Sequence, residues 1–271
     1  MIKQAIIPLA GLGTRLLPLT SVFAKELLPI NGKPGLEYIL EECIEAGIKE
    51  VVFIISKKKL MIKKYFYNDK FYKDIIKKKN DPKIIKEYKK ILKYKKMIKF
   101  VFQDKPLGTG DAVFKTKKFI TDKYFLMLLP DDLIIKKNCS KSMITVHNKF
   151  KASVMASMKV NKNDVSRWGI YNIKKKIDKN NFVISNVVEK PSIKTSPSNN
   201  AVIGRYILPK TIFSKLKSLK PGKSGEFHIT DAIQALIEDD NQFIGHNFSG
   251  KYLDCGTMKG YIKSTLEISK Q

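Results

Sequence analysis

The chain has 271 residues, of which 43% are hydrophobic, and 52 lysines and arginines against 25 acids give a net charge of +27. That hydrophobic content excludes a disordered basic tail, and the length is enough to bury a sizeable core. The apolar runs are far too short to cross a bilayer, so we expect no membrane partner. The start of the chain has no signal-peptide layout, and Cys43, Cys139 and Cys255 lack metal-ligand spacing. We therefore expect a cytoplasmic protein with reduced thiols.

The excess positive charge comes almost entirely from lysine, because the only arginines are Arg15, Arg167 and Arg205. Surfaces that bind nucleic acids usually favour arginine, whose planar fork contacts phosphate and guanine through two hydrogen bonds. So strong a lysine bias is more typical of codon drift in an AT-rich genome. We expect no specific nucleic-acid partner, and a basic nucleic-acid-binding protein stays as the alternative from outside the enzyme classes.

The first part of the chain alternates strand and helix patterns. Residues 5–9 form an apolar run typical of a buried strand, and a glycine loop follows at once. Residues 36–44 place their apolar side chains on one helical face, between Pro34 and Gly47, and residues 50–55 are rich in β-branched side chains. This order predicts a parallel sheet with crossover helices, and hence an α/β fold.

Residues 57–99 interrupt the alternation and hold 18 lysines and four acids. Apolar residues between positions 84 and 92 recur with helical spacing, Asp81 is placed to cap that helix, and Pro82 suits its first turn. We expect this segment to be an amphipathic helical insertion with its lysines in water. No repeat or linker divides the chain, so the sequence predicts a single domain over residues 1–271.

Later elements follow the same alternation. Strands are expected at residues 99–102, 124–129, 152–160 and 201–208. Thr230 and Asp231 begin a helix that runs to about Ile237.

The first candidate site is the glycine loop at residues 10–15, whose sequence is AGLGTR. Two glycines after a strand let backbone N–H groups approach a phosphate or a base. The loop lacks the third glycine of the dinucleotide fingerprint and the Gly-Lys-Ser/Thr ending of a P-loop. Gly222-Lys223-Ser224 is not a P-loop either, since Lys217 stands where glycine is needed. The spacing predicts an anion or a nucleotide at a strand end, and a purely structural tight turn stays open.

Charged residues near other strand ends extend this prediction. Lys25 comes ten residues after Arg15, and two cations beside a glycine loop suit a triphosphate. Asp131 and Asp132 directly follow the strand expected at residues 124–129, where a carboxylate is a natural ligand for Mg²⁺. The alternative is a pair of turn-forming aspartates.

Two more acidic positions are candidates. Glu189 and Lys190 end an apolar run, where the carboxylate could accept hydrogen bonds from sugar hydroxyls and the ammonium could hold a phosphate. An exposed strand end is the alternative for this pair. Asp254 offers a second carboxylate. The three histidines form no triad and no zinc spacing, which argues against a hydrolytic nucleophile.

Taken in order, these segments resemble the bacterial UTP–glucose-1-phosphate uridylyltransferases, also called UDP-glucose pyrophosphorylases. The resemblance covers about residues 2–265. The uridylyl branch is favoured over the thymidylyl branch by the opening AGLG, where the latter usually has GGxG, and by the insertion at residues 57–99. A thymidylyltransferase or another sugar-1-phosphate nucleotidyltransferase is the alternative within the class. The matching segments are residues 7–15, 25–29, 33–34, 103, 108–113, 129–131, 168–169, 189–191, 204–206, 229–232 and 254–256.

The resemblance implies a Rossmann-like mixed, mainly parallel central sheet flanked by helices, of the nucleotidyltransferase, glycosyltransferase-A-like type. It implies Mg²⁺-dependent transfer of UMP from UTP to α-D-glucose 1-phosphate by a homo-oligomeric enzyme. In the family pattern, the nucleotide-binding residues are Ala10, Gly11, Leu12, Gly13, Thr14, Gln103 and Gly108. The catalytic residues are Arg15, Lys25 and Lys190, the sugar-phosphate-binding residues are Gly169, Glu189, Lys190 and Gly204, and the metal ligands are Asp131 and Asp254.

The sequence departs from the family pattern at three positions. Thr109 and Asp111 stand where the family usually has leucine and histidine, and Trp168 stands where tyrosine is usual. Asp111 adds a negative charge near the expected base pocket.

Overall fold

The computed structural model describes residues 1–222 and 225–270, so Lys223 and Ser224 lie outside the described residues. Within them, nine strands form one mixed sheet in the order β5-β4-β1-β6-β11-β8-β12-β10-β9. Strands β5, β4, β1 and β6 are parallel neighbours, whereas β11 is antiparallel to β6 and to β8. The bounds are β1 Gln4–Pro8, β4 Glu50–Ile55, β5 Ile98–Phe102, β6 Tyr124–Leu128, β8 Ser153–Lys159, β9 Gly169–Lys176, β10 Asn181–Glu189, β11 Asn200–Pro209 and β12 Phe243–Asn247.

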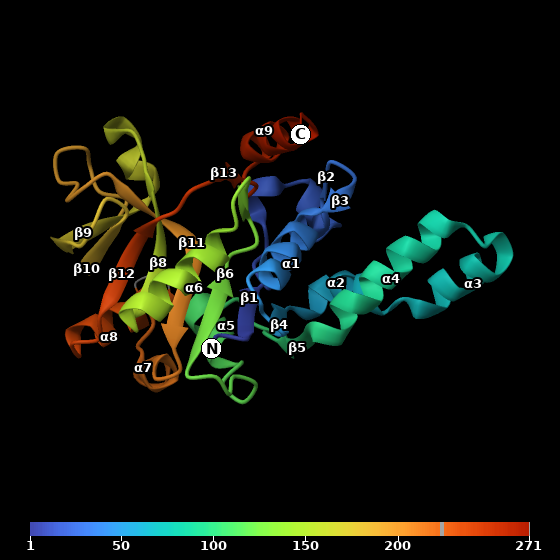
Figure 1. The fold of residues 1–271 in the computed structure, drawn as a ribbon, viewed down its shortest axis with the longest axis horizontal. Helices are drawn as coiled ribbons and strands as arrows, with labels where there is room; N and C mark the ends of the chain where they lie inside the picture. Colours follow the sequence, from blue (N-terminus) through green and yellow to red (C-terminus); the bar gives the residue numbers. More distant parts are fainter. Residues whose placement is uncertain (223–224, 271) are drawn as a thin grey trace.

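Helices cover both faces of this sheet (Figure 1). Successive strand residues point to opposite faces, so Ile7 and Phe53 pack with helices α1 and α6, and Ile6 and Ile54 pack with α5, α7 and α8. No helix in residues 1–222 or 225–270 is long and apolar enough to span a membrane. The helix bounds are α1 Gly35–Glu45, α5 Thr109–Phe114, α6 Cys139–Phe150, α7 Ile212–Ser218 and α8 Ile229–Glu238.

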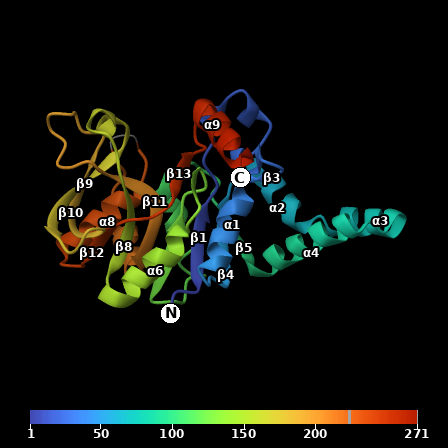
Figure 2. The same ribbon diagram turned by 45° about the horizontal axis from the view of Figure 1, so that its top comes forward.

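Three helices fill the chain between β4 and β5: α2 (Leu60–Tyr67), α3 (Asp69–Lys79) and α4 (Pro82–Met97). Asp81 caps α4 as expected, because its Oδ1 accepts a hydrogen bond of 2.7 Å from the backbone N–H of Lys83. Helix α3 and the adjoining part of α4 extend away from the sheet as an arm (Figure 1, Figure 2). Ile62 and Phe66 of α2 are buried and anchor the base of this arm in the core.

Two short two-stranded sheets sit beside the main one. β2 (Pro29–Ile30) pairs with β3 (Lys33–Pro34), and β7 (Asp132–Ile135) pairs with β13 (Lys251–Asp254). The final helix, α9 (Met258–Ser269), contacts both β13 and β2. The antiparallel register of β7 and β13 places Asp254 opposite Asp132, and so brings the end of the chain back to the turn after β6.

Candidate active site

Three loops leave the same edge of the sheet, because β1, β5 and β6 are parallel and end together. The glycine loop follows β1, Gln103 follows β5, and Asp131 follows β6. All three line one cavity of about 520 Å³. Of the residues predicted for the nucleotide and the reaction, the structure gathers around this cavity Ala10, Gly11, Leu12, Gly13, Thr14, Lys25, Gln103, Gly108 and Asp131.

The glycine loop leaves its backbone open to the cavity. A Cβ on Gly11 would meet nothing within 4 Å, so a ligand can approach the chain closely there. Gly13 adopts a left-handed conformation with φ 72°, and a Cβ on it would lie 3.1 Å from Cγ2 of Thr20. The hydroxyl of Thr20 donates a 2.8 Å hydrogen bond to the carbonyl of Gly13 and fixes the turn. Glycine is therefore favoured at position 13 by the conformation, and at position 11 it leaves the backbone accessible from the cavity.

Two cations contact the carboxylate of Asp131, and of these Lys25 lines the cavity whereas Arg15 is not among its described lining residues. Lys25 Nζ lies 2.8 Å and Arg15 Nη2 lies 3.4 Å from Oδ2 of Asp131. Burial lowers the pKa of Lys25, but the charges of Asp131 and Glu26 outweigh it and hold that pKa above its ordinary value. Burial raises the pKa of Asp131, and the charge of Lys25 outweighs it and holds that pKa below its ordinary value. Both groups are therefore charged at neutral pH.

A second buried ion pair supports this wall, and sequence reasoning missed it. Both carboxylate oxygens of Glu26 accept hydrogen bonds of 2.8 Å from Lys59 Nζ, and both side chains are at least nine-tenths buried. Glu26 is the residue next to Lys25, so the pair ties the turn before α2 to the cavity. The one signal in the sequence was an acidic residue in the apolar run 24–30, because Lys59 is one of 18 lysines in its segment.

The carboxylates of Asp131 and Asp254 both approach the backbone at Gly256. A Cβ on Gly256 would lie 2.9 Å from Oδ2 of Asp131, 3.2 Å from Oδ1 of Asp254 and 2.9 Å from Nη2 of Arg15, so glycine allows all three groups to approach the backbone here. No group of three or more His, Cys, Asp or Glu residues in the described ranges could hold a metal by itself. Two carboxylates nevertheless fit Mg²⁺, which completes its octahedral shell with water and substrate phosphates.

A second cavity, of about 680 Å³, adjoins the first. The two cavities share Thr109, Leu129 and His228 as lining residues, and the second also includes Glu189. Glu189 lies opposite Gly169 in the β9–β10 pair, where a Cβ on Gly169 would approach its Oε2 to 3.0 Å. Strand β9 also pairs with β11, and this brings the β9–β10 hairpin back toward the end of β6.

Lys190 and Gly204, two of the residues predicted to bind the sugar phosphate, lie outside both cavities. Lys190 has a left-handed backbone with φ 46°, and its ammonium is exposed at 3.9 Å from Oε1 of Glu189. Gly204 packs against the turn after β6, where its N–H donates a 2.8 Å hydrogen bond to Oδ2 of Asp132. A Cβ on Gly204 would lie 2.5 Å from the same oxygen, so glycine allows this close approach. Of the four residues predicted to bind the sugar phosphate, only Glu189 is among the described residues that line the two cavities, and Gly169, Lys190 and Gly204 are not.

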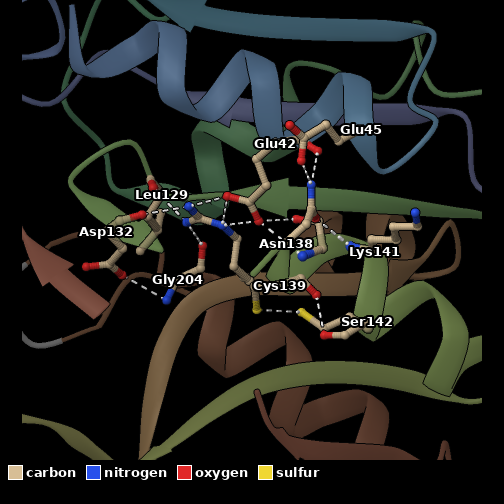
Figure 3. A network of polar contacts seen from close by, with 12 residues as sticks. Glu42, Glu45, Leu129, Asp132, Asn138, Cys139, Lys141, Ser142 and Gly204 are labelled. Carbon is tan, nitrogen blue, oxygen red and sulfur yellow. Dashed lines mark hydrogen bonds and ion pairs between the residues drawn. The ribbon is translucent and has the colours of Figure 1, made fainter. Parts of the chain in front are cut away.

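Arg205 lies beneath this turn with a side chain that is 0% exposed. Its guanidinium donates to both carboxylate oxygens of Glu42 and to the carbonyls of Leu129 and Asp132, at 2.6–3.1 Å (Figure 3). Burial and the nearby charge of Asp131 raise the pKa of Asp132 to about 6. Arg205 had no assigned role from sequence, although an arginine inside an apolar strand was a visible signal. It holds the backbone that presents Asp131.

The comparisons with known proteins agree with this architecture. The profile of the family described as nucleotidyl transferase matches residues 4–271. The chain belongs to this family. A Bacillus subtilis member named UTP–glucose-1-phosphate uridylyltransferase is 35% identical over 271 residues, which cover all of this chain and 92% of that protein.

Solved structures of UDP-glucose pyrophosphorylases have the same fold as this nucleotidyl transferase. A UDP-glucose pyrophosphorylase complexed with UDP-glucose is 34% identical, with a TM-score of 0.87 over 100% of this chain and 99% of that chain. A UTP-bound enzyme of the same kind from Acinetobacter baumannii is 31% identical, with a TM-score of 0.89 over 99% of this chain and 93% of that chain. The fold class and the resemblance expected from the sequence are confirmed, while the roles of single residues stay predictions.

Proposed function

We propose that this nucleotidyl transferase transfers UMP from UTP to α-D-glucose 1-phosphate in the presence of Mg²⁺, giving UDP-glucose and pyrophosphate. The observation that carries the proposal is the pair of adjoining cavities, one with the glycine loop and Gln103 and the other with Glu189. Relatives of nearly the same length that carry the name of this activity support it.

In the proposed reaction, a phosphate oxygen of glucose 1-phosphate attacks the α-phosphorus of UTP. The bond from the α-phosphorus to the bridging oxygen breaks, and pyrophosphate leaves with the electron pair. The attacking oxygen is already anionic, so no general base is needed, and the rate comes from positioning and charge stabilisation.

The residues of this chain supply both effects. The backbone of the glycine loop and Gln103 would hold the base, and Arg15 and Lys25 would stabilise the triphosphate and the departing pyrophosphate. Lys190 would hold the sugar phosphate. The carboxylate of Glu189 would accept hydrogen bonds from glucose hydroxyls, and the backbone N–H of Gly169 would donate one to them.

Asp131 and Asp254 would hold Mg²⁺, which when bound supplies positive charge to the phosphate oxygens. Asp131 is paired with Lys25 and Arg15. These two cations are therefore already next to the place where phosphate charge would be neutralised.

The test is pyrophosphate release from glucose 1-phosphate and Mg²⁺ with UTP, dTTP, ATP, CTP and GTP in parallel. We expect UTP to give the strongest signal and a chelator to abolish it. A preference for dTTP would move the enzyme to the thymidylyl branch. If no nucleotide gives pyrophosphate release and the protein binds arbitrary duplex DNA tightly and in a salt-dependent way, the nucleic-acid-binding alternative is favoured.

A further inference from the structure

The side-chain amide of Gln103 is held in one orientation. Its Nε2 donates hydrogen bonds to the carbonyl of Gly108 at 3.1 Å and to Oδ2 of Asp111 at 2.8 Å. Both partners are acceptors without a proton to donate. Turning the amide over would place Oε1 against two oxygens and lose both hydrogen bonds, so the observed orientation is strongly favoured.

This orientation leaves an acceptor for the ligand. Gln103 lines the nucleotide cavity and is 4% exposed. Across residues 1–222 and 225–270, Oε1 of Gln103 has no hydrogen-bond partner, whereas Nε2 has two. A base that enters the cavity beside Gln103 therefore meets a carbonyl oxygen and needs an N–H group to pair with it.

Asp111 is itself firmly placed. It lies in the first turn of α5, and its Oδ1 is 3.4 Å from Nζ of Lys115 one turn later. The loop before it is tied to residues 226–229, because Phe227 donates to the carbonyl of Leu107 at 2.8 Å and accepts from the N–H of Gly110 at 2.7 Å. These backbone contacts fix the start of α5 beside Gln103, whereas the ion pair with Lys115, whose side chain is 36% exposed, adds little to the position of the carboxylate.

We propose that Asp111, by locking the amide of Gln103 with Oε1 toward the cavity, is the residue that makes the enzyme select uracil or thymine over cytosine. This inference rests on the proposed function in placing the base beside Gln103. Uracil and thymine carry N–H at ring position 3, which can donate to Oε1. Cytosine carries an unprotonated nitrogen there, which would face Oε1 acceptor to acceptor. A buried site built for one hydrogen-bond pattern rejects the opposite pattern because polar groups are left unpaired.

The experiment is isothermal titration calorimetry of UTP and of CTP, with Mg²⁺ and without sugar phosphate. The proteins are the wild type, Asp111→Ala, Asp111→Asn and, as a matched control, Lys115→Ala. Loss of the carboxylate removes the closer of the two acceptors that hold Nε2 and leaves only the carbonyl of Gly108, so the turned amide becomes more accessible and we expect the preference for UTP over CTP to fall about tenfold in Asp111→Ala. Asp111→Asn keeps the size of the side chain but can pair with either orientation of the Gln103 amide, since its Oδ1 can accept from Nε2 and its Nδ2 can donate to Oε1, so its preference should fall as well.

Lys115→Ala removes the other partner of Asp111 but not its contact with Gln103, so the preference should be unchanged. Equal weakening of UTP and CTP binding in the Asp111 variants would show a merely structural role and overturn the inference. So would a wild type that binds CTP as tightly as UTP. Failure of the proposed function is distinguishable, since it would appear as no UDP-glucose from glucose 1-phosphate while the preference for UTP persists.

Discussion

Glu42 and Arg205 are 163 positions apart in the chain, yet Glu42 Oε2 lies 2.8 Å from Nη2 of Arg205 in a fully buried pair. The pair joins α1 to β11 next to the turn that carries Asp131. The guanidinium also donates to the carbonyls of Leu129 and Asp132 on either side of that turn. The position of Asp131 thus depends on an ion pair outside the cavity.

Replacing Glu42 by alanine should destabilise the protein strongly. Arg205 would keep a buried charge without its counter-ion, which typically costs about 3–5 kcal/mol in the free energy of unfolding. Urea unfolding measures this cost, and Glu45→Ala on the same helix, at an exposed position, is the control. Similar losses in the two variants would contradict the account. The double variant Glu42→Leu/Arg205→Met should recover part of the loss, because it removes both charges.

Asp131→Asn and Asp254→Asn should lower turnover by roughly a hundredfold, because both carboxylates would hold the metal that neutralises phosphate charge. The Mg²⁺ concentration needed for half-maximal rate should rise in both variants. Asp74→Asn, at an exposed position on the arm, is the control for a simple change in net charge. Near-normal turnover in Asp131→Asn, with unchanged Mg²⁺ dependence, would rule out the metal assignment.

Lys190→Ala should raise the KM for glucose 1-phosphate and lower kcat together, because its ammonium is expected to hold the sugar phosphate in both the ground state and the transition state. The expected loss in kcat/KM is roughly tenfold to a hundredfold. Steady-state kinetics with each substrate varied in turn measure it, and Lys194→Ala in the following loop is the control. A variant in which only the UTP dependence changes would show that Lys190 has a different role.

His246 should make the protein less stable in mild acid. Its ring is buried, with Nδ1 2.8 Å from Oδ1 of Asn181 and Nε2 3.2 Å from Oγ of Ser142. Burial lowers the pKa of His246 below the ordinary 6.5. The unfolded chain therefore binds the proton first, and stability present above pH 6.5 is lost as the pH falls toward the folded pKa.

Urea midpoints at pH 7.5 and 5.5 test this sign. The wild type should lose more stability between the two pH values than His246→Gln does. Equal losses in both proteins would show that the proton equilibrium of His246 is not linked to folding.

The strands near the start of the chain could be predicted from sequence because they are buried on both faces. In β1 and β4 nearly every residue is apolar, so the run itself marks the strand, and the structure places both within one residue of the expected bounds. Helix α1 was equally clear, since its apolar positions follow the helical period and Pro34 precedes its first residue. By contrast, β9 is half polar and ends in three lysines, and no strand was expected there.

The site was only partly predictable, for a physical reason. Residues that follow parallel strands can be placed at one sheet edge from the chain order, and the structure gathers Gly11, Gln103 and Asp131 around one cavity accordingly. Contacts between segments that are far apart in the chain cannot be predicted from the chain order in this way. The 2.8 Å pairs of Arg205 with Glu42 and of Lys59 with Glu26 depend on how helices pack over the sheet, which spacing alone does not specify.

The most direct test of the account is to follow a phosphorus label from UTP in the presence of glucose 1-phosphate and Mg²⁺. With the label at the α-position, we expect it to appear in UDP-glucose. With the label at the γ-position, it should appear only in pyrophosphate, and in equal amount. Label from the γ-position on a sugar product, or release of α-labelled UMP without any UDP-glucose, would contradict uridylyl transfer as the reaction of this enzyme.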